Sequence, residues 1–198
     1  MKAFLIKNIL LFLCFIRFGM TAEAQERSVL IPDYALVQHA GSIGYLSLGA
    51  GYEIFDDARG SLELTYGHVP EVKGGPLNIV SAKFAYRPVE LRVNNTITAY
   101  PANPGVFLSY HLDKQFGLGF DREQYGRGYY GWPTALRGHL SLSNEVAIKT
   151  GEKLKSVTIY SEFNVNDLYL VSLFYKNNKQ WLSPFDIIKL GFGVKVGF

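Results

Sequence analysis

His139 and Ser141 are the side chains whose types and spacing best suit chemistry in this sequence. Residues two apart lie on the same face of a β-strand, so His139 could take the proton of the Ser141 hydroxyl. Glu145 or Glu152 would supply a carboxylate to orient the imidazole, as in nucleophilic hydrolysis. The alternative interpretation is structural, with His139 facing a polar interior and hydrogen-bonded to a serine or a glutamate.

The remaining histidines and the single cysteine do not indicate a metal site. His39, His68 and His111 are scattered, each near the end of an expected strand, and no His, Asp or Glu spacing resembles a ligand set. Cys14 is the only cysteine and falls within a predicted signal peptide, so the mature chain has no thiol chemistry. No metal and no cofactor are predicted.

The segment 113–133 is the preferred binding region. It is the longest expected loop, and loops of this length in compact domains are usually functional. Aromatic and arginine-rich surfaces suit contacts with proteins or glycans, although the same residues could form an aromatic belt and lid over a barrel mouth. The residues expected to make such contacts are Phe120, Arg122, Tyr125, Arg127, Tyr129, Tyr130 and Trp132.

The elements that position these groups are strands, and the clearest is 186–198. Apolar side chains from Ile188 to Phe198 fall on one face of it, and lysines and glycines fall on the other. Similar alternation runs through 44–54, 62–67, 80–87, 106–111 and 136–149.

Hydrophobicity spread by alternation indicates the fold class. The chain is 48% hydrophobic and 15% aromatic with 20 glycines, yet no apolar run after residue 24 is long enough for a membrane helix. A membrane β-barrel conceals its hydrophobicity in this way. Periodicity does not tell which face is inside, so a secreted soluble barrel or sandwich is the alternative. We predict an all-β, eight-stranded antiparallel transmembrane β-barrel.

Residues 1–24 are typical of a secretory signal peptide, which leaves 25–198 as the barrel domain. Lys2 and Lys7 precede a short apolar core, and small residues up to Ala24 suit cleavage. Removing this segment lowers the net charge from +3 to +1, because it holds three basic residues and one acid. The basic character of the full chain therefore gives no argument for nucleic-acid binding.

The count of eight strands follows from the spacing of turns. The first strand is expected at 29–38, and the stretch from Val157 to Tyr175 is expected to form one long strand. In the alternative, this stretch breaks into two strands and the first strand is lost. Short turns are expected at 56–60, 87–92 and 150–153, and opposite loops at 39–42, 69–76, 113–133 and 177–184.

A barrel of eight strands is only wide enough for its own side chains or a very small ligand. Buried charges of both signs should pair, so we expect a salt-bridged interior rather than an open general pore. The charged or titratable residues expected inside are Glu53, Glu63, Lys83, Arg87, Arg137, His139, Glu145, Lys149, Lys189 and Lys195.

Three segments carry a family resemblance: Tyr66-Gly-His-Val-Pro70, the glycine- and aromatic-rich 126–136, and Val194-Lys-Val-Gly-Phe198. Through them the mature chain resembles the small outer-membrane β-barrel proteins of the Bacteroidota. The resemblance implies a location in the outer membrane and recognition of the final strand, which ends on Phe198, by the barrel-assembly machinery. It implies no activity.

A second resemblance concerns His139 and Ser141. A similar His-x-Ser pair serves the lipid A 3-O-deacylases, which are also eight-stranded outer-membrane barrels. In that family the pair lies near the chain end and faces lipid, whereas here it lies far from the end and on the face expected inside.

The sequence therefore predicts a non-enzymatic outer-membrane barrel. Its partners would be outer-membrane lipid, lipopolysaccharide, or a protein or glycan at the outer loops. A lipid A-modifying acyl hydrolase and a narrow pore or transporter are the rival hypotheses.

Overall fold

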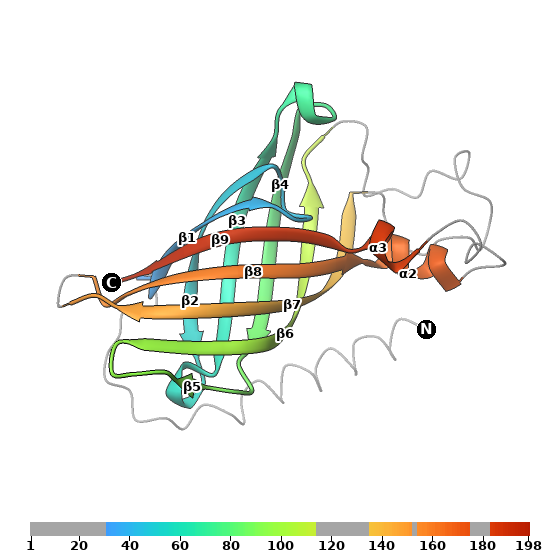
Figure 1. The fold of residues 1–198 in the computed structure, drawn as a ribbon. Coiled ribbons are helices and arrows are strands. Elements are labelled where there is room, and N and C mark those ends of the chain that lie inside the picture. Colours follow the sequence, from blue (N-terminus) through green and yellow to red (C-terminus); the bar gives the residue numbers. More distant parts are fainter. Residues whose placement is uncertain (1–30, 114–134, 152–153, 175–182) are drawn as a thin grey trace, which may run out of the picture. The chain divides into compact units, whose positions relative to one another are not determined.

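The computed structural model describes residues 31–113, 135–151, 154–174 and 183–198. The predicted signal peptide lies outside this part of the chain. The strands within it are β1 (Tyr34–Ala40), β2 (Leu46–Ile54), β3 (Gly60–Val69), β4 (Leu77–Tyr86), β5 (Leu91–Arg92), β6 (Ile97–His111), β7 (Leu136–Lys149), β8 (Ser156–Asn166) and β9 (Lys189–Gly197) (Figure 1).

Within the residues that the structure describes, helical structure is confined to short segments. The helices are the 3₁₀ turns Asp56–Ala58 and Glu71–Lys73 and the α-helices α2 (Asp167–Phe174) and α3 (Pro184–Ile187). None of the described helices has the length and apolar character that crossing a membrane would require.

Eight of the strands close into one antiparallel barrel. Each strand pairs with the next along the chain, β4 pairs directly with β6, and β1 pairs with β9 to complete the ring. The short β5 lies outside the ring and pairs only with the start of β6. The predicted all-β, eight-stranded antiparallel barrel is thus confirmed.

The barrel has two distinct ends, which we call the terminal end and the loop end. Tyr34 at the start of β1 pairs with Gly197 at the end of β9, which defines the terminal end (Figure 1). The connections at the terminal end are 55–59, 87–96 and 150–155, and those at the loop end are 41–45, 70–76, 112–135 and 167–188.

The polarity of the barrel is inverted relative to a soluble fold. Among the described residues, 19 buried side chains are polar or charged and only 9 are apolar. Every barrel strand instead exposes at least one large apolar side chain on the outside; examples are Val37, Leu48, Leu64, Val80, Val106, Leu140, Ile159 and Phe192, which are 40–60% exposed. The apolar stripes seen in the sequence therefore form the outer surface.

The expected long strand from Val157 to Tyr175 is wrong in its second half. Strand β8 ends at Asn166, and helix α2 follows. The side chain of Asn166 accepts a hydrogen bond from the backbone N–H of Tyr169 at 2.8 Å, which satisfies one of the open donors at the start of the helix. Most residues of the helix are apolar. An apolar residue therefore also stands at every second position through most of it, and this matches the strand pattern although the segment is helical.

Two strand boundaries also differ from expectation. The first strand begins at Tyr34 and runs to Ala40, rather than covering 29–38. The turn expected at 87–92 extends to residue 96, because the Asn94 side chain accepts the backbone N–H groups of Thr96 and Ile97 and holds a wider loop that contains β5.

Two tyrosine rings fill the space left by glycines on neighbouring strands. Tyr34 lies opposite Gly51, and Tyr160 lies opposite Gly193. A Cβ atom added at Gly193 would stand 2.4 Å from the Tyr160 ring. The Tyr160 hydroxyl in turn donates a hydrogen bond to Gln38 at 2.8 Å, so this ring cannot move without losing that bond.

Gly193→Ala is expected to lower the free energy of unfolding by about 1–3 kcal/mol, because the added methyl group meets a fixed aromatic ring. Urea unfolding of the refolded protein measures this loss. Gly138→Ala on β7 is the matched control, because nothing lies within 4 Å of its added Cβ. Equal stability of the two variants would contradict the assignment of Gly193 as a packing site.

Candidate functional site

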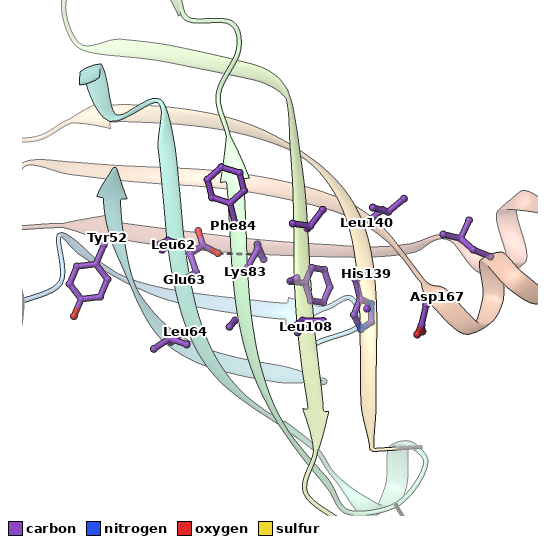
Figure 2. Close-up of a pocket in the computed structure, with 15 residues that line it drawn as sticks. Tyr52, Leu62, Glu63, Leu64, Lys83, Phe84, Leu108, His139, Leu140 and Asp167 are labelled. Atoms are coloured by element: carbon purple, nitrogen blue, oxygen red, sulfur yellow. Dashed lines mark ion pairs between the residues drawn. The ribbon is translucent and has the colours of Figure 1, made fainter. Parts of the chain in front are cut away.

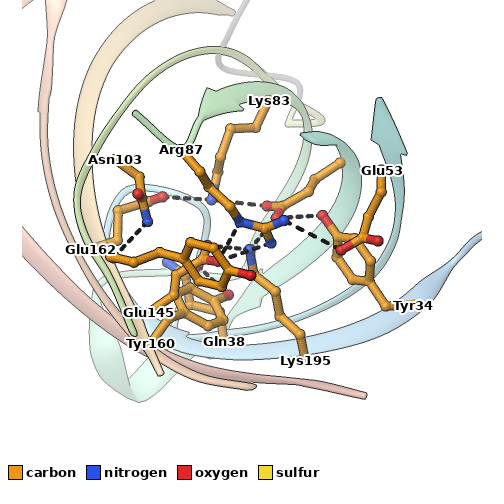
Figure 3. A network of polar contacts seen from close by, with 12 residues as sticks. Tyr34, Gln38, Glu53, Lys83, Arg87, Asn103, Glu145, Tyr160, Glu162 and Lys195 are labelled. Atoms are coloured by element: carbon orange, nitrogen blue, oxygen red, sulfur yellow. Dashed lines mark hydrogen bonds and ion pairs between the residues drawn. The ribbon is translucent and has the colours of Figure 1, made fainter. Parts of the chain in front are cut away.

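The interior is occupied by a chain of alternating carboxylates and cations (Figure 3). Lys83 Nζ lies 2.6 Å from Glu162 Oε2 and 3.2 Å from Glu63 Oε2. Lys195 Nζ continues the chain, at 2.7 Å from Glu63 Oε1 and 2.6 Å from Glu145 Oε1. We call these residues, with Arg87 and Glu53 described next, the ion-pair network.

Arg87 ends the network toward the terminal end of the barrel. Its Nη2 lies 2.9 Å from Glu145 Oε2, and its Nη1 lies 3.3 Å from Glu53 Oε1. Nη1 also donates to the backbone carbonyl of Ala58 at 2.9 Å. Arg87 follows the last residue of β4; burial acts to lower its pKa, but the carboxylates of Glu145 and Glu53 outweigh burial and raise it above its ordinary value.

The network is electrically balanced where it is most buried. Three buried carboxylates, from Glu63, Glu145 and Glu162, face three buried cations, from Lys83, Arg87 and Lys195. Glu53 is the exposed end, with 39% of its side chain accessible. Balanced pairing is what buried charge requires, because an isolated charge in a low-dielectric interior is strongly unfavourable.

Two tyrosines complete the surroundings of Lys195. The Tyr34 hydroxyl donates to Glu63 Oε1 at 2.9 Å. The Lys195 ammonium lies 4.9 Å from the centre of the Tyr160 ring and 5.4 Å from that of Tyr34, so both rings contribute cation–π contacts.

The expected salt-bridged interior is confirmed, with Glu162 missed and Lys189 misplaced. Glu162 also belongs to the network but was not among the residues expected inside. It lies on the polar face of β8, while Ile159 and Phe163 lie on the other face, and this alternation could have identified it. Lys189 was expected inside but is exposed, whereas Lys149 is exposed at the terminal end, where it lines a cavity described below. Lys189 instead donates to the Asp186 carbonyl at 3.3 Å.

His139 lies inside the barrel, 5% exposed, and is hydrogen-bonded to a serine, as the structural interpretation expected, although that serine is not Ser141. Its Nε2 is 2.8 Å from the Ser109 hydroxyl of the neighbouring strand β6. Its ring stacks on Phe107, with ring centres 4.1 Å apart and planes within 5°. The imidazole is therefore buried between the Ser109 hydroxyl and the Phe107 ring and is shielded from solvent.

The structure does not assemble His139, Ser141 and Glu145 into one constellation. Ser141 lies opposite Gly105 and Asn164, and Glu145 is engaged by Lys195 and Arg87. Glu152, the other candidate carboxylate, lies outside the described residues. His39, His68 and His111 all lie near the loop end, as expected. Within the described part of the chain, no group of three or more potential ligands could hold a metal ion.

The β1–β2 connection packs into the loop end of the barrel. Ile43 in this connection is completely buried, and its carbonyl oxygen would stand 1.7 Å from a Cβ atom added at Gly67 inside β3. The Ser42 hydroxyl donates to the Asn164 side chain of β8, on another part of the ring. The connection therefore folds inward across the mouth.

The terminal end holds a polar cavity of about 510 Å³. Its lining comes from the ends of β2 and β7, the start of β6 and β8, and the residue that follows β4. Arg87 and Glu53 of the network belong to its wall, together with Tyr100, Lys149 and Lys155. Arg87 stacks on the Tyr100 ring, with 5.0 Å between the guanidinium carbon and the ring centre.

The outer face carries a separate apolar hollow of about 700 Å³ across β2, β3, β4, β6 and β7 (Figure 2). Its exposed apolar side chains include Leu62, Leu64, Leu108 and Leu140, and Asp167 and Leu170 of α2 border it. The Glu63–Lys83 ion pair lies on the other side of the same strands. A single layer of backbone therefore separates an apolar exterior from a charged interior.

The binding residues predicted in the segment 113–133 all lie outside the described residues, and Asp113 is the one residue of that segment that the structure describes. Phe120, Arg122, Tyr125, Arg127, Tyr129, Tyr130 and Trp132 therefore keep the status of a prediction.

Comparisons of the chain with protein-family models, with curated proteins and with solved structures give no match. The function has to be inferred from the geometry of the chain itself.

Proposed function

We propose that this protein is an integral outer-membrane β-barrel protein with a closed, ion-paired interior and a structural or binding role rather than an enzymatic one. The observation that carries the proposal is the inverted polarity of the barrel. Large apolar side chains on all eight strands face outward, while the carboxylates and ammonium groups face inward.

A lipid environment is the solvent that such a surface fits. In water, an exposed apolar belt on every strand would drive association, whereas in a bilayer the same belt contacts acyl chains. Closure of the ring also matters, because each of the eight barrel strands is hydrogen-bonded to a neighbour on both sides and the ring presents no open strand edge to lipid. Partners would then be membrane lipid and lipopolysaccharide around the belt. A protein or glycan would bind the loop 113–133.

The two rival functions lack supporting geometry. A lipid A hydrolase would need its histidine on the lipid-facing side, but His139 is buried inside. A transporter would need a continuous wet path, but the ion-pair network and Ile43 occupy successive levels of the interior. We therefore expect neither deacylation of lipid A nor steady conductance.

The test uses the mature chain refolded in detergent and in lipid vesicles. We expect an unboiled sample to run faster on an SDS gel than a boiled one, because the closed hydrogen-bonded ring resists the detergent. Added to planar bilayers, the same preparation should give no reproducible conductance steps. A soluble, monodisperse protein without a gel shift would contradict the membrane location. Stepwise conductance would instead contradict the closed interior.

A further inference from the structure

The cavity at the terminal end is not explained by membrane insertion or by the closed interior. Its floor is the Arg87 guanidinium, only 6% exposed and held in place by Glu145, Glu53 and the Ala58 carbonyl. These partners fix the guanidinium, so the part of it that faces the cavity is held at a defined position.

Two further cations stand at the rim of this cavity. Lys149 and Lys155 are exposed, and the ion pairs of the described residues involve neither of them. Their backbones are fixed: the N–H of Lys149 donates to the Thr96 carbonyl at 2.8 Å, and the Lys155 carbonyl accepts from Thr150 at 3.2 Å. The backbone thus holds both lysines at the rim, and their exposed side chains can reach a ligand in the cavity.

The lining favours an anion over a cation. Glu53 is the single carboxylate among the described lining residues; it pairs with Arg87 at 3.3 Å, and Lys149 and Lys155 outnumber it. Hydroxyl groups of Thr98, Ser156 and Thr158 add donors around the wall. The cavity therefore surrounds its contents with hydrogen-bond donors and with an excess of positive charge that comes from the two rim lysines.

The arrangement of these donors favours a tetrahedral oxyanion. The cations come from three places on the barrel: the end of β4, the end of β7 and the turn before β8. A phosphate group presents oxygens in several directions and can accept from all three, whereas a planar carboxylate presents two oxygens in one plane. The volume of about 510 Å³ accommodates a ligand larger than one phosphate group.

We propose that the terminal-end cavity is a binding site for a phosphate-bearing anion, with Arg87 at its floor and Lys149 and Lys155 at its rim. The phosphate belongs either to a soluble polyphosphorylated molecule or to the headgroup of an anionic lipid whose chains lie beside the barrel. Both sources share the same recognition chemistry and are separated by experiment.

The first experiment measures binding of tripolyphosphate by titration calorimetry, with the full mature chain in a non-ionic, phosphate-free detergent. The test variant is Lys149→Gln/Lys155→Gln, which leaves the ion-pair network untouched. The matched control is Lys73→Gln/Lys189→Gln, which removes two lysines at the loop end. We expect the test variant to bind at least about tenfold more weakly than the control, because two charge-assisted contacts are lost.

The second experiment records native mass spectra of the same proteins with phosphatidylglycerol or phosphatidylcholine. Lipid adducts seen only with phosphatidylglycerol and lost in the test variant identify the headgroup source, and tripolyphosphate binding alone identifies the soluble source. The proposal is overturned if neither probe binds the wild-type chain, if binding persists in the test variant, or if the control loses binding equally. Both experiments use detergent micelles, so their results do not depend on whether the protein resides in the outer membrane.

Discussion

Leu64→Arg is expected to destabilise the barrel in lipid vesicles by about 2–4 kcal/mol, the cost of placing a cation on the lipid face near the middle of a bilayer. Leu64 lies midway along β3, points outward and is 60% exposed. On a water-exposed surface a substitution at such a residue would change stability by no more than about 0.5 kcal/mol. The measurement is urea unfolding in vesicles. The folded fraction is read from the difference in gel mobility between folded and unfolded protein.

Val72→Arg is the matched control for this prediction. Val72 is 88% exposed, but it lies in the short helical turn between β3 and β4, beyond the strands at the loop end. The same apolar-to-cationic change there should have little effect on unfolding. Equal and small effects of the two substitutions would mean that Leu64 faces water, and the proposed membrane location would have to be abandoned.

Lys195→Met is expected to cost about 3–5 kcal/mol of unfolding free energy, because it leaves buried negative charge without its partner. Lys195 joins Glu63 to Glu145 at the centre of the ion-pair network, at 2.7 and 2.6 Å. Without it, three buried carboxylates face only two buried cations. Urea unfolding in vesicles measures the loss.

Two further variants separate charge imbalance from the loss of a lysine. Lys189→Met makes the same change on the same strand, where the lysine is exposed and outside the network, and should be nearly neutral. Lys195→Met/Glu63→Gln leaves Lys83 paired with Glu162 and Arg87 paired with Glu145, so most of the lost stability should return. Additive losses in the double variant would rule out charge balance as the reason for the network.

The sequence alone determined the strand content, the number of barrel strands and the division of each strand into an apolar and a polar face. These are local properties, because side chains alternate along a strand whatever it later pairs with. The same reasoning correctly placed Glu63, Lys83, Glu145 and Lys195 on the polar face. It failed from Val157 to Tyr175, because an apolar helix can continue an apolar stripe; the cue was Asn166, whose side chain caps that helix.

Tertiary structure decided which face is inside and which polar groups meet there. Alternation is symmetric between the two faces, and only closure of the ring through β1 and β9 turns one of them inward. Partners inside depend on register between strands distant in the sequence, so Glu162 reaches Lys83 across 79 positions and His139 meets Ser109 rather than Ser141. Spacing along one strand could not give these pairs, because each partner comes from a different strand.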